Sequence, residues 1–441
     1  GLHYLENTEN VGLQSLMTAA GVKTPVSATA AAFSIAPRIN ASGRFGSASE
    51  AVELLLCEDP EAAETMAKHL NDLNSSRKKT ESEIMEEIRA HILENPEILH
   101  RRILFLYGEG WHHGVIGIVA SKLVDRFGKT VFILSDDGDF ARGSARGIEG
   151  FSIHEALTAC GGLLTKFGGH SGAGGFSLKK EDIDSFNEAL QKYAAAEYSE
   201  MPIRTLHADK LITPDELTAE SVSTLSMLEP CGEGNPSPMF AMLSVKLLDI
   251  IPLSGGAHTK LKLSYSGVET VGLLFGEKTE DFSFRAGDLL DMLVCPEINT
   301  YGGRTSVNIR IADYRKSGIP QQKYFAAKSA YERYKRGEGV SSQLIPRIVP
   351  SRDELAAVYR AVPQGRYVSF DAVFQTVCGN DINYCKLRFA LDIFCELGLF
   401  EADLYSETVT RLPAEKKVNL DDSVLLTELK SLSHKAEKIT L

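Results

Sequence analysis

Residues 103–134, ILFLYGEGWHHGVIGIVASKLVDRFGKTVFIL, decide the fold class of the part of the chain around them. The apolar run at their start predicts a short buried strand, and the spacing of the apolar residues that follow predicts a helix. Downstream, Ser152 and Glu155 form a capping box, which marks the start of another helix. Strands are expected at 103–107, 130–134 and 140–148, and helices at 115–127, 152–166 and 181–198. Strands that alternate with helices predict a compact α/β domain over residues 101–200.

Other patterns flank this domain on both sides. Before it, apolar residues recur at helical spacing on a charged background, which is typical of a solvated connector helix. After it, alternating runs with a single helix predict an OB-like β-barrel, and three helices with a hairpin then predict a winged helix. The expected segments are an N-terminal piece (1–48), a connector helix (49–100), the barrel (201–316), a basic linker (317–349) and a winged-helix-like α+β domain (350–441). The whole chain is therefore predicted to be a multidomain α/β protein.

Composition narrows the class of protein. The chain has 441 residues, which suits about three domains, and a formal net charge of −12. The acidic balance argues against a protein that binds nucleic acid over its whole surface, but it permits a local basic groove. The seven cysteines form no C-x-x-C pair, which indicates reduced thiols and a cytoplasmic location. No apolar run approaches the roughly 18 residues that a membrane span needs, so no membrane partner is expected.

The segment GGHSGAGG, residues 168–175, holds five glycines in eight positions. Backbone N–H groups in such a loop can cradle a phosphate, and an imidazole among glycines is placed to meet a ligand. Gly168, Gly169 and His170 are therefore candidate ligand contacts. A tight turn between a helix and a strand is the alternative. A nucleotide P-loop is not expected, because no Lys-Ser or Lys-Thr pair follows the glycines.

A second pattern is Gly-Ser-Ala-Arg at residues 143–146. Ser144 and Arg146 lie two positions apart in an expected strand, so their side chains share one face. A hydroxyl beside a guanidinium suits a phosphate, which arginine binds through two parallel hydrogen bonds. A surface salt bridge is the competing interpretation of this short pattern.

Two further segments carry polar side chains in apolar surroundings. PRINASGR, residues 37–44, contributes Arg38, Asn40 and Arg44, although a helix-capping loop would use the same residue types. His112 and His113 stand between a strand and a helix. The sequence offers no converging set of carboxylates and histidines of the kind that a two-metal hydrolytic site requires. We therefore assign no metal ligand in this chain.

In combination, four strings resemble the RecJ-type single-stranded-DNA exonucleases of the DHH phosphoesterase superfamily. They are APRINASGR (36–44), GWHHGVIGIVASKLVDRFG (110–128), GSAR (143–146) and FGGHSGAGG (167–175). LEPCGEGNPSPMF (228–240) resembles the start of that family's OB domain. The family's glycine–histidine motif usually continues with two alanines and a glycine, whereas Gly172-Ala173-Gly174 stands here. The resemblance reaches to about residue 316, and the tail at 350–428 matches more weakly.

The resemblance implies Mn²⁺- or Mg²⁺-dependent 5′→3′ hydrolysis of single-stranded DNA in repair and recombination. It places the metal ligands, including an Asp-His-His string, in a domain upstream of Gly1, of which 1–48 would be the last part. This chain alone is therefore expected to bind no metal and to be inactive, while 101–200 would be the DHH-associated domain. Other repair proteins would bind its C-terminal domain. The residues implied in binding single-stranded DNA and its 5′ phosphate are Arg38, Asn40, Arg44, His112, Ser144, Arg146, Gly168, Gly169 and His170, and His170 is also the implied catalytic residue.

Two other functions stay open at this point. The first is a phosphodiesterase of the same superfamily that cleaves cyclic dinucleotides or short oligonucleotides. The predicted barrel argues against it, because a dinucleotide needs no extended binding surface. The second is a non-catalytic scaffold that binds single-stranded DNA.

The stretch 315–347 is unusually basic, with eight Lys or Arg against two Glu. One interpretation is a solvated helix that links two domains, with Tyr331 and Tyr334 packed on the barrel. The other is a path for the DNA strand beyond the barrel, lined by Lys323, Lys328, Arg333, Lys335 and Arg336. Charge alone does not separate the two.

Overall fold

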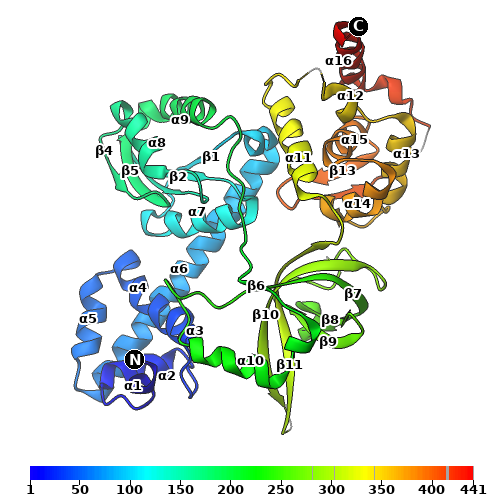
Figure 1. Cartoon of the computed structure of the whole chain (residues 1–441). Helices are drawn as coiled ribbons and strands as arrows, with labels where there is room; N and C mark the ends of the chain where they lie inside the picture. The colour runs from blue at the N-terminus through cyan, green and yellow to red at the C-terminus, as the bar shows by residue number, and fades with distance from the viewer. Residues whose placement is uncertain (281, 302, 342, 414–416, 441) are drawn as a thin grey trace. The chain divides into compact units, whose positions relative to one another are not determined.

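A computed structural model gives the structure of the chain (Figure 1). It describes residues 1–441 except 281, 302, 342, 414–416 and 441. The chain divides into two compact units. The first comprises Gly1–Thr205 and Pro230–Asn235, and the second comprises Leu206–Glu229 and Pro236–Leu441. Among the described residues, no helix is both long and apolar enough to cross a membrane.

The first unit begins with a cluster of short helices. They are α1 (Leu2–Glu6), α2 (Val11–Ala19), α3 (Ala28–Ala30), a π-helical turn (Ala31–Ile35), α4 (Ala36–Phe45) and α5 (Ala48–Leu56). Their small core is built around Leu16, Ile35 and Leu54, and it extends onto the first half of the long helix that follows.

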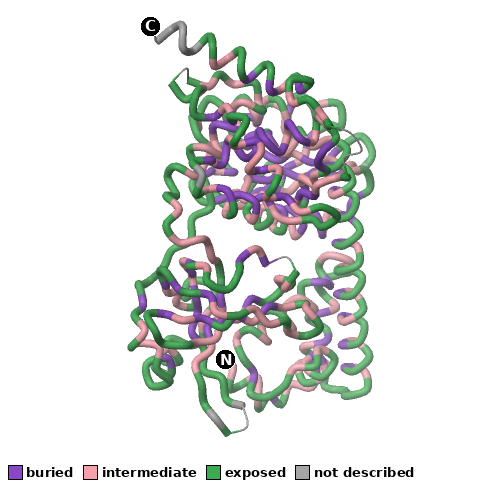
Figure 2. The backbone as a smooth tube through the Cα atoms, turned by 90° about the vertical axis from the view of Figure 1, so that its right-hand side faces the viewer, coloured by how far each residue is buried: buried purple, intermediate pink, exposed green. Residues whose placement is uncertain are grey.

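Helix α6 (Pro60–Glu94) is 35 residues long and starts at the N-cap Asp59, whose side chain accepts from the Glu61 N–H. Buried and exposed residues alternate along it (Figure 2). Its buried residues are Ala63, Ala67, Leu70, Asn74, Glu81, Ile84, Ile88 and Ile92. The expected connector over 49–100 differs from this in one respect. Helix α5 is separate and belongs to the N-terminal core, whereas α6 buries one face along its length and leaves most of its residues exposed to solvent, as expected.

The α/β domain follows α6 and a 3₁₀ turn (Pro96–His100). Its elements are β1 (Leu104–Gly108), α7 (His113–Phe127), β2 (Val131–Asp137), β3 (Phe140–Arg146), α8 (Ile153–Ala159), β4 (Lys166–Gly169), β5 (Ala173–Lys179) and α9 (Ile183–Glu197). The sheet order is β1-β2-β3-β5-β4, with β1 and β2 parallel and the other neighbours antiparallel. The alternation of strands and helices predicted from the sequence is confirmed.

One predicted element of this domain is wrong. The helix expected over 152–166 ends at Ala159, and residues 166–169 form strand β4. The physical reason is visible in the sequence, because Gly161 and Gly162 follow and glycine is a poor helix former. The chain therefore turns early and adds an edge strand to the sheet.

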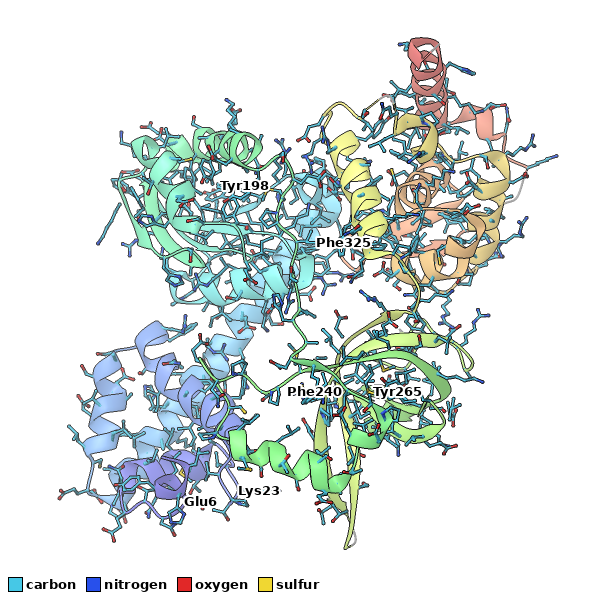
Figure 3. All side chains as sticks on the ribbon, viewed as in Figure 1. Glu6, Lys23, Tyr198, Phe240, Tyr265 and Phe325 are labelled. Carbon is cyan, nitrogen blue, oxygen red and sulfur yellow. The ribbon has the colours of Figure 1, made fainter. Side chains whose placement is uncertain are left out.

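The second unit starts with a closed β-barrel. Its strands are β7 (Phe240–Leu253), β8 (His258–Tyr265), β9 (Val268–Leu274), β10 (Leu289–Tyr301) and β11 (Arg304–Lys316), preceded by β6 (Lys210–Leu211) and α10 (Ala219–Thr224). The order β10-β11-β9-β8-β7 is closed by pairing of β10 with β7. Tyr265, labelled in Figure 3, donates from its hydroxyl to the Ile212 carbonyl oxygen at 2.7 Å and ties the segment before the barrel to its wall. The OB-like barrel predicted from the alternating runs is confirmed.

The C-terminal domain contains α13 (Arg352–Ala361), α14 (Phe370–Val377) and α15 (Tyr384–Glu396), followed by the hairpin β13 (Phe400–Asp403) and β14 (Thr408–Arg411). A short strand β12 (Val368–Ser369) pairs with β14, and α12 (Ile345–Ile348) and α16 (Val424–Thr440) complete the domain. Three helices and a hairpin in this order match the predicted winged-helix-like α+β arrangement. Helix α15 is the centre of its core, with nine buried residues, among them Arg388.

The segment expected to be a basic linker over 317–349 is mostly folded. Helix α11 (Gln321–Lys335) is part of the C-terminal domain's core, and Tyr331 is only 1% exposed. Tyr331 and Tyr334 both pack against Phe389 of α15, with ring centroids 5.3 and 4.9 Å apart. The interpretation that these tyrosines pack on the barrel is therefore wrong. Their aromatic surface is large enough to recruit a charged helix to a neighbouring core.

The basic side chains of α11 are also accounted for within the C-terminal domain. Lys335 pairs with Asp392 at 3.1 Å, and Arg336 pairs with Glu338 at 2.8 Å. Lys328 lies 5.9 Å from the centroid of the Tyr384 ring. These contacts neutralise or cover much of the local positive charge, and they favour a structural role for α11 over a path for DNA.

Replacing Tyr331 tests whether α11 is core. We expect Tyr331→Ala to lower the free energy of unfolding of the C-terminal domain by about 3–5 kcal/mol, the usual cost of removing a buried aromatic ring. Far-UV circular dichroism follows this loss. The chain's single tryptophan, Trp111, lies in the first unit and should show an unchanged fluorescence transition. Lys323→Ala in the same helix is the control, because Lys323 is exposed. Equal stability of the two variants would contradict a core position for α11.

Candidate functional site

Strand β3 presents Ser144 and Arg146 on one face, as the alternation of side chains along a strand predicts. The Arg146 guanidinium Nη1 donates to the Ser144 hydroxyl oxygen at 3.0 Å and to the Ala145 carbonyl oxygen at 2.8 Å. Ala145, which faces the other way, is fully buried in the core. The two side chains therefore form a hydroxyl–guanidinium pair that is partly open to solvent.

Helix α7 begins beside this pair. His112 is its N-cap, and the Nδ1 atom accepts from the Gly114 N–H at 3.1 Å. The imidazole also stacks on the Phe45 ring, with centroids 4.2 Å apart and planes 9° from parallel. The structure thus gives His112 a capping and packing position at the end of α4, next to the residues below.

Arg44 comes from the last turn of α4 and donates from Nη1 to the Gly114 carbonyl oxygen. Burial lowers the pKa of Arg146, and the positive charge of Arg44 lowers it further. Burial likewise lowers the pKa of Arg44, with a further contribution from Arg77 of α6. We call Arg44, His112, Ser144 and Arg146 the arginine cluster. Like charges gathered at a half-buried place favour an anion, because an anion relieves their repulsion.

The glycine-rich segment forms the β4–β5 hairpin, not a turn between a helix and a strand. At its tip, the His170 N–H donates to the Ala173 carbonyl oxygen at 2.8 Å, and His170 Nδ1 accepts from the Gly172 N–H at 3.2 Å. Ala173 is the partner of Arg146 in the sheet register, and the Gly147 N–H donates to the Gly172 carbonyl oxygen at 2.9 Å. The hairpin tip therefore lies beside the end of β3 that carries Arg146, and His170 is exposed there.

Two of the glycines near this hairpin are required by the backbone. Gly169 has φ +149°, and a Cβ there would collide with Ala173 backbone and Gly174. Gly143 lies directly under the Phe176 ring, which would occupy the place of any side chain. These contacts give the glycines a structural cause that is independent of any ligand.

Arg38 and Asn40 are placed differently from the arginine cluster. Arg38 donates from Nε to the Asn71 side-chain oxygen at 3.0 Å and from Nη1 to the Ser34 carbonyl oxygen at 2.6 Å. The bond to Asn71 holds α4 against α6, and the bond to Ser34 returns to the turn before α4. Asn40 is exposed on α4. The structure thus brings Arg44, His112, Ser144 and Arg146 together, while Arg38 serves the packing of the helices.

Polar residues of helix α6 lie next to the arginine cluster and to α7. Glu81, a buried carboxylate, accepts from Arg77 at 2.8 Å and also pairs with Lys122 of α7. Trp111 Nε1 donates to Glu87 at 2.7 Å. Polar contacts across an otherwise apolar seam therefore fix how α6 meets α7.

Within the part of the chain that the structure describes, no group of three or more His, Cys, Asp or Glu side chains is arranged to hold a metal ion.

Comparison with known proteins agrees with this architecture. Residues 97–196 match the DHHA1 domain and residues 208–313 match the RecJ OB domain. The single-stranded-DNA-specific exonuclease RecJ of Bacillus subtilis is 32% identical over 71% of this chain and 40% of its own length. The RecJ of Thermus thermophilus is 30% identical over 77% of this chain and 49% of its own length. The chain is RecJ-like in both domains.

Solved structures of RecJ support the same assignment. The Thermus thermophilus RecJ structure with Mg²⁺ has a TM-score of 0.61 and 28% identity, and covers 72% of this chain and 48% of the other. The structure with Mn²⁺ has a TM-score of 0.62 and 29% identity over 72% of this chain and 46% of the other. The chain thus spans half or less of the length of these RecJ relatives.

Three members of the arginine cluster lie in the region that matches the DHHA1 domain, and Arg44 lies at the end of α4. Sequence reasoning identified its four members, but it missed the support from Arg77 and Phe45. It also overlooked Gly114 and Gly117, which lie against the cluster. The signal for these two was present in the string GVIG, since both glycines fall on one side of the helix.

The structural position of Arg38 leads to a test. We expect Arg38→Ala to lower the free energy of unfolding by about 1–2 kcal/mol, because one hydrogen bond between α4 and α6 and one to the Ser34 carbonyl oxygen are lost. Affinity for single-stranded DNA, measured by fluorescence anisotropy, should not change. Asn71→Ala removes one of the same bonds from its other partner and should reproduce part of the stability loss. Weaker DNA binding at unchanged stability would instead place Arg38 on the substrate.

Proposed function

We propose that this chain is the substrate-binding portion of a RecJ-like 5′→3′ single-stranded-DNA exonuclease. The observation that carries the proposal is the arginine cluster, in which Arg44 and Arg146 gather positive charge beside the Ser144 hydroxyl. The similarity to RecJ in both the DHHA1 and the OB domain supports single-stranded DNA as the ligand.

The terminal 5′ phosphate is the part of the strand that fits the arginine cluster. A phosphate monoester carries a charge of −1.5 to −2 at neutral pH and three strong acceptor oxygens. The Arg146 guanidinium can donate to two of them in parallel, and Ser144 can donate its hydroxyl proton to a third. Arg44 adds a second positive charge. An anion bound between Arg44 and Arg146 attracts both groups and so offsets their mutual repulsion.

The glycine hairpin supplies the next contacts in this proposal. Gly168 and Gly169 are exposed and carry no side chain, so a nucleotide can approach their backbone closely. His170 stands at the tip beside the Arg146 end of β3, and we place it near the scissile bond. His112 and Asn40 complete the proposed binding residues on the α4 side.

The barrel offers a surface for the rest of the strand. Phe275, just after β9, is 59% exposed and meets the His258 ring at a centroid distance of 5.5 Å. OB folds bind single strands by stacking bases on exposed aromatic rings, typically with about 1–3 kcal/mol per base. We propose Phe275 as such a stacking residue, a position that could not be assigned from the sequence.

Hydrolysis itself is proposed to depend on Mn²⁺ or Mg²⁺ held by residues that this chain does not contain. Support comes from the RecJ structures with those ions and from the fraction of RecJ that the chain spans. We further propose a cytoplasmic role in DNA repair and recombination, with the C-terminal domain binding other repair proteins. The RecJ OB domain disfavours a phosphodiesterase of cyclic dinucleotides, whereas a non-catalytic scaffold would bind DNA in the same way.

The isolated chain should bind single-stranded DNA and hydrolyse it negligibly. Binding is measured with a labelled oligonucleotide, and affinity should fall steeply with salt because phosphate contacts release counterions. Hydrolysis is followed as nucleotide release in the presence of Mn²⁺, with double-stranded DNA as the control substrate. Robust Mn²⁺-dependent release from the single strand would show that the chain carries its own catalytic centre. Failure to bind single strands at low salt would contradict the proposed function.

Removing the Arg146 guanidinium should abolish a preference for 5′-phosphorylated over 5′-hydroxyl ends. A hydrogen bond to a charged group contributes about 1.5–3 kcal/mol, which corresponds to a loss of roughly 10- to 150-fold for Arg146→Ala. The measurement is competition between two oligonucleotides that differ only in the 5′ group. Arg142→Ala removes an exposed arginine from the same strand and should keep the preference. Equal behaviour of the two variants would make Arg146 a structural residue.

A further inference from the structure

Helix α7 contacts the arginine cluster through glycine. A Cβ placed on Gly117 would lie 3.0 Å from the Ser144 hydroxyl oxygen and 3.1 Å from Nη2 of Arg146. Both distances are shorter than an ordinary van der Waals contact of a carbon atom. Any side chain at this position would therefore push on the two donor groups directly.

The same holds one helical turn earlier. A Cβ on Gly114 would lie 3.0 Å from the Arg44 carbonyl oxygen, 3.1 Å from the Arg44 Cβ and 3.1 Å from Cε1 of His112. Positions three apart lie on the same side of a helix. The first two turns of α7 thus show bare backbone to all four members of the arginine cluster.

We infer that Gly117 is a positioning residue for the 5′ phosphate, because its missing side chain sets where the Ser144 and Arg146 donors stand. This rests on the proposed function. The Arg146 fork is held from two sides, by its bonds to Ser144 and Ala145 and by the backbone of α7 at Gly117. Parallel hydrogen bonds to two phosphate oxygens depend on the orientation of that fork, and a shift of a few tenths of an ångström misaligns them.

The residue also separates phosphate recognition from strand binding. Gly117 touches the donors of the terminal phosphate, whereas a 5′-hydroxyl strand offers no monoester for those donors. A side chain at Gly117 should therefore lower the affinity for a 5′-phosphorylated end selectively. A merely structural role in helix packing would change the affinity for both kinds of end together, or change stability alone.

The test uses graded substitutions in the full 441-residue chain. Gly117→Ala should reduce the preference for 5′-phosphorylated over 5′-hydroxyl oligonucleotide by about 2- to 12-fold, the range for losing one ordinary hydrogen bond. Gly117→Val should reduce it to the level of Arg146→Ala. Affinity for the 5′-hydroxyl oligonucleotide should stay as in the unsubstituted chain. Trp111 fluorescence confirms that the first unit is folded, and Gly117→Ala suffices if the valine variant does not fold.

A matched control separates positioning from helix propensity. Gly43 lies in helix α4, and a Cβ there has nothing closer than the Ala48 Cβ at 4.0 Å. Gly43→Ala and Gly117→Ala gain the same intrinsic helix propensity, so both can raise stability. Only Gly117→Ala should change the phosphate preference.

A second substitution identifies the atom through which Gly117 acts. Ser144→Ala removes the hydroxyl oxygen that a Cβ on Gly117 would press against. In that background, Gly117→Ala should cost less of the remaining preference than it does alone, and this non-additivity shows direct contact.

The outcomes distinguish the inference from the function on which it rests. If the unsubstituted chain shows no preference that Arg146→Ala abolishes, the proposed function fails. If Arg146→Ala abolishes the preference but both Gly117 variants keep it in full, the inference about Gly117 is wrong while the proposed function stands. An equal loss of affinity for both oligonucleotides in Gly117→Ala would also overturn the inference.

Discussion

The first unit depends on one constraint, which is that it must hold the positive charges of Arg44, Arg77 and Arg146 close together. Burial lowers the pKa of Arg146 and of Arg44, and the repulsion of Arg44 with Arg146 and with Arg77 lowers them further. Such an arrangement persists only when packing elsewhere stabilises it. The apolar seams of α6 with the N-terminal helices and of α7 with the sheet provide that packing. The buried Glu81, bonded to Arg77 and Lys122, offsets part of the charge while leaving Arg44 and Arg146 for an anion.

The polar and the apolar contacts have different roles in this unit. Apolar side chains supply most of the stability, because folding removes much apolar surface from water. The hydrogen bond of Arg38 to Asn71 of α6 and that of Trp111 to Glu87 then select one arrangement of the helices among many of similar burial. An anion site built from residues about a hundred positions apart needs this selection, since a misplacement of even 1 Å would separate its donors.

The sequence predicted the parts of this fold that depend on local periodicity. The α/β alternation, the barrel strands and the shared face of Ser144 and Arg146 follow from spacing alone. An error arose where a local pattern had to be weighed against a distant partner. Helix α11 carries so many charges that it resembled a linker, and only the Phe389 ring of α15 shows why it is core. Arg38 and Arg44 occupy one motif, yet the acceptors at Asn71 and Gly114 give them different tasks. The role of Gly117 could not be predicted from the sequence for the same reason, because it depends on which strand packs against α7.

The length of α6 has a mechanical consequence. At 1.5 Å per residue, its 35 residues extend about 50 Å, and one half packs in the N-terminal core while the other meets α7. The direction in which the first half of α6 faces is therefore fixed relative to the direction in which its second half faces. One residue inserted between Asn74 and Ile84 would turn one half by about 100° against the other, given 3.6 residues per turn. The N-terminal helices would then present Arg44 to a different direction, although every residue of the arginine cluster would still be in place.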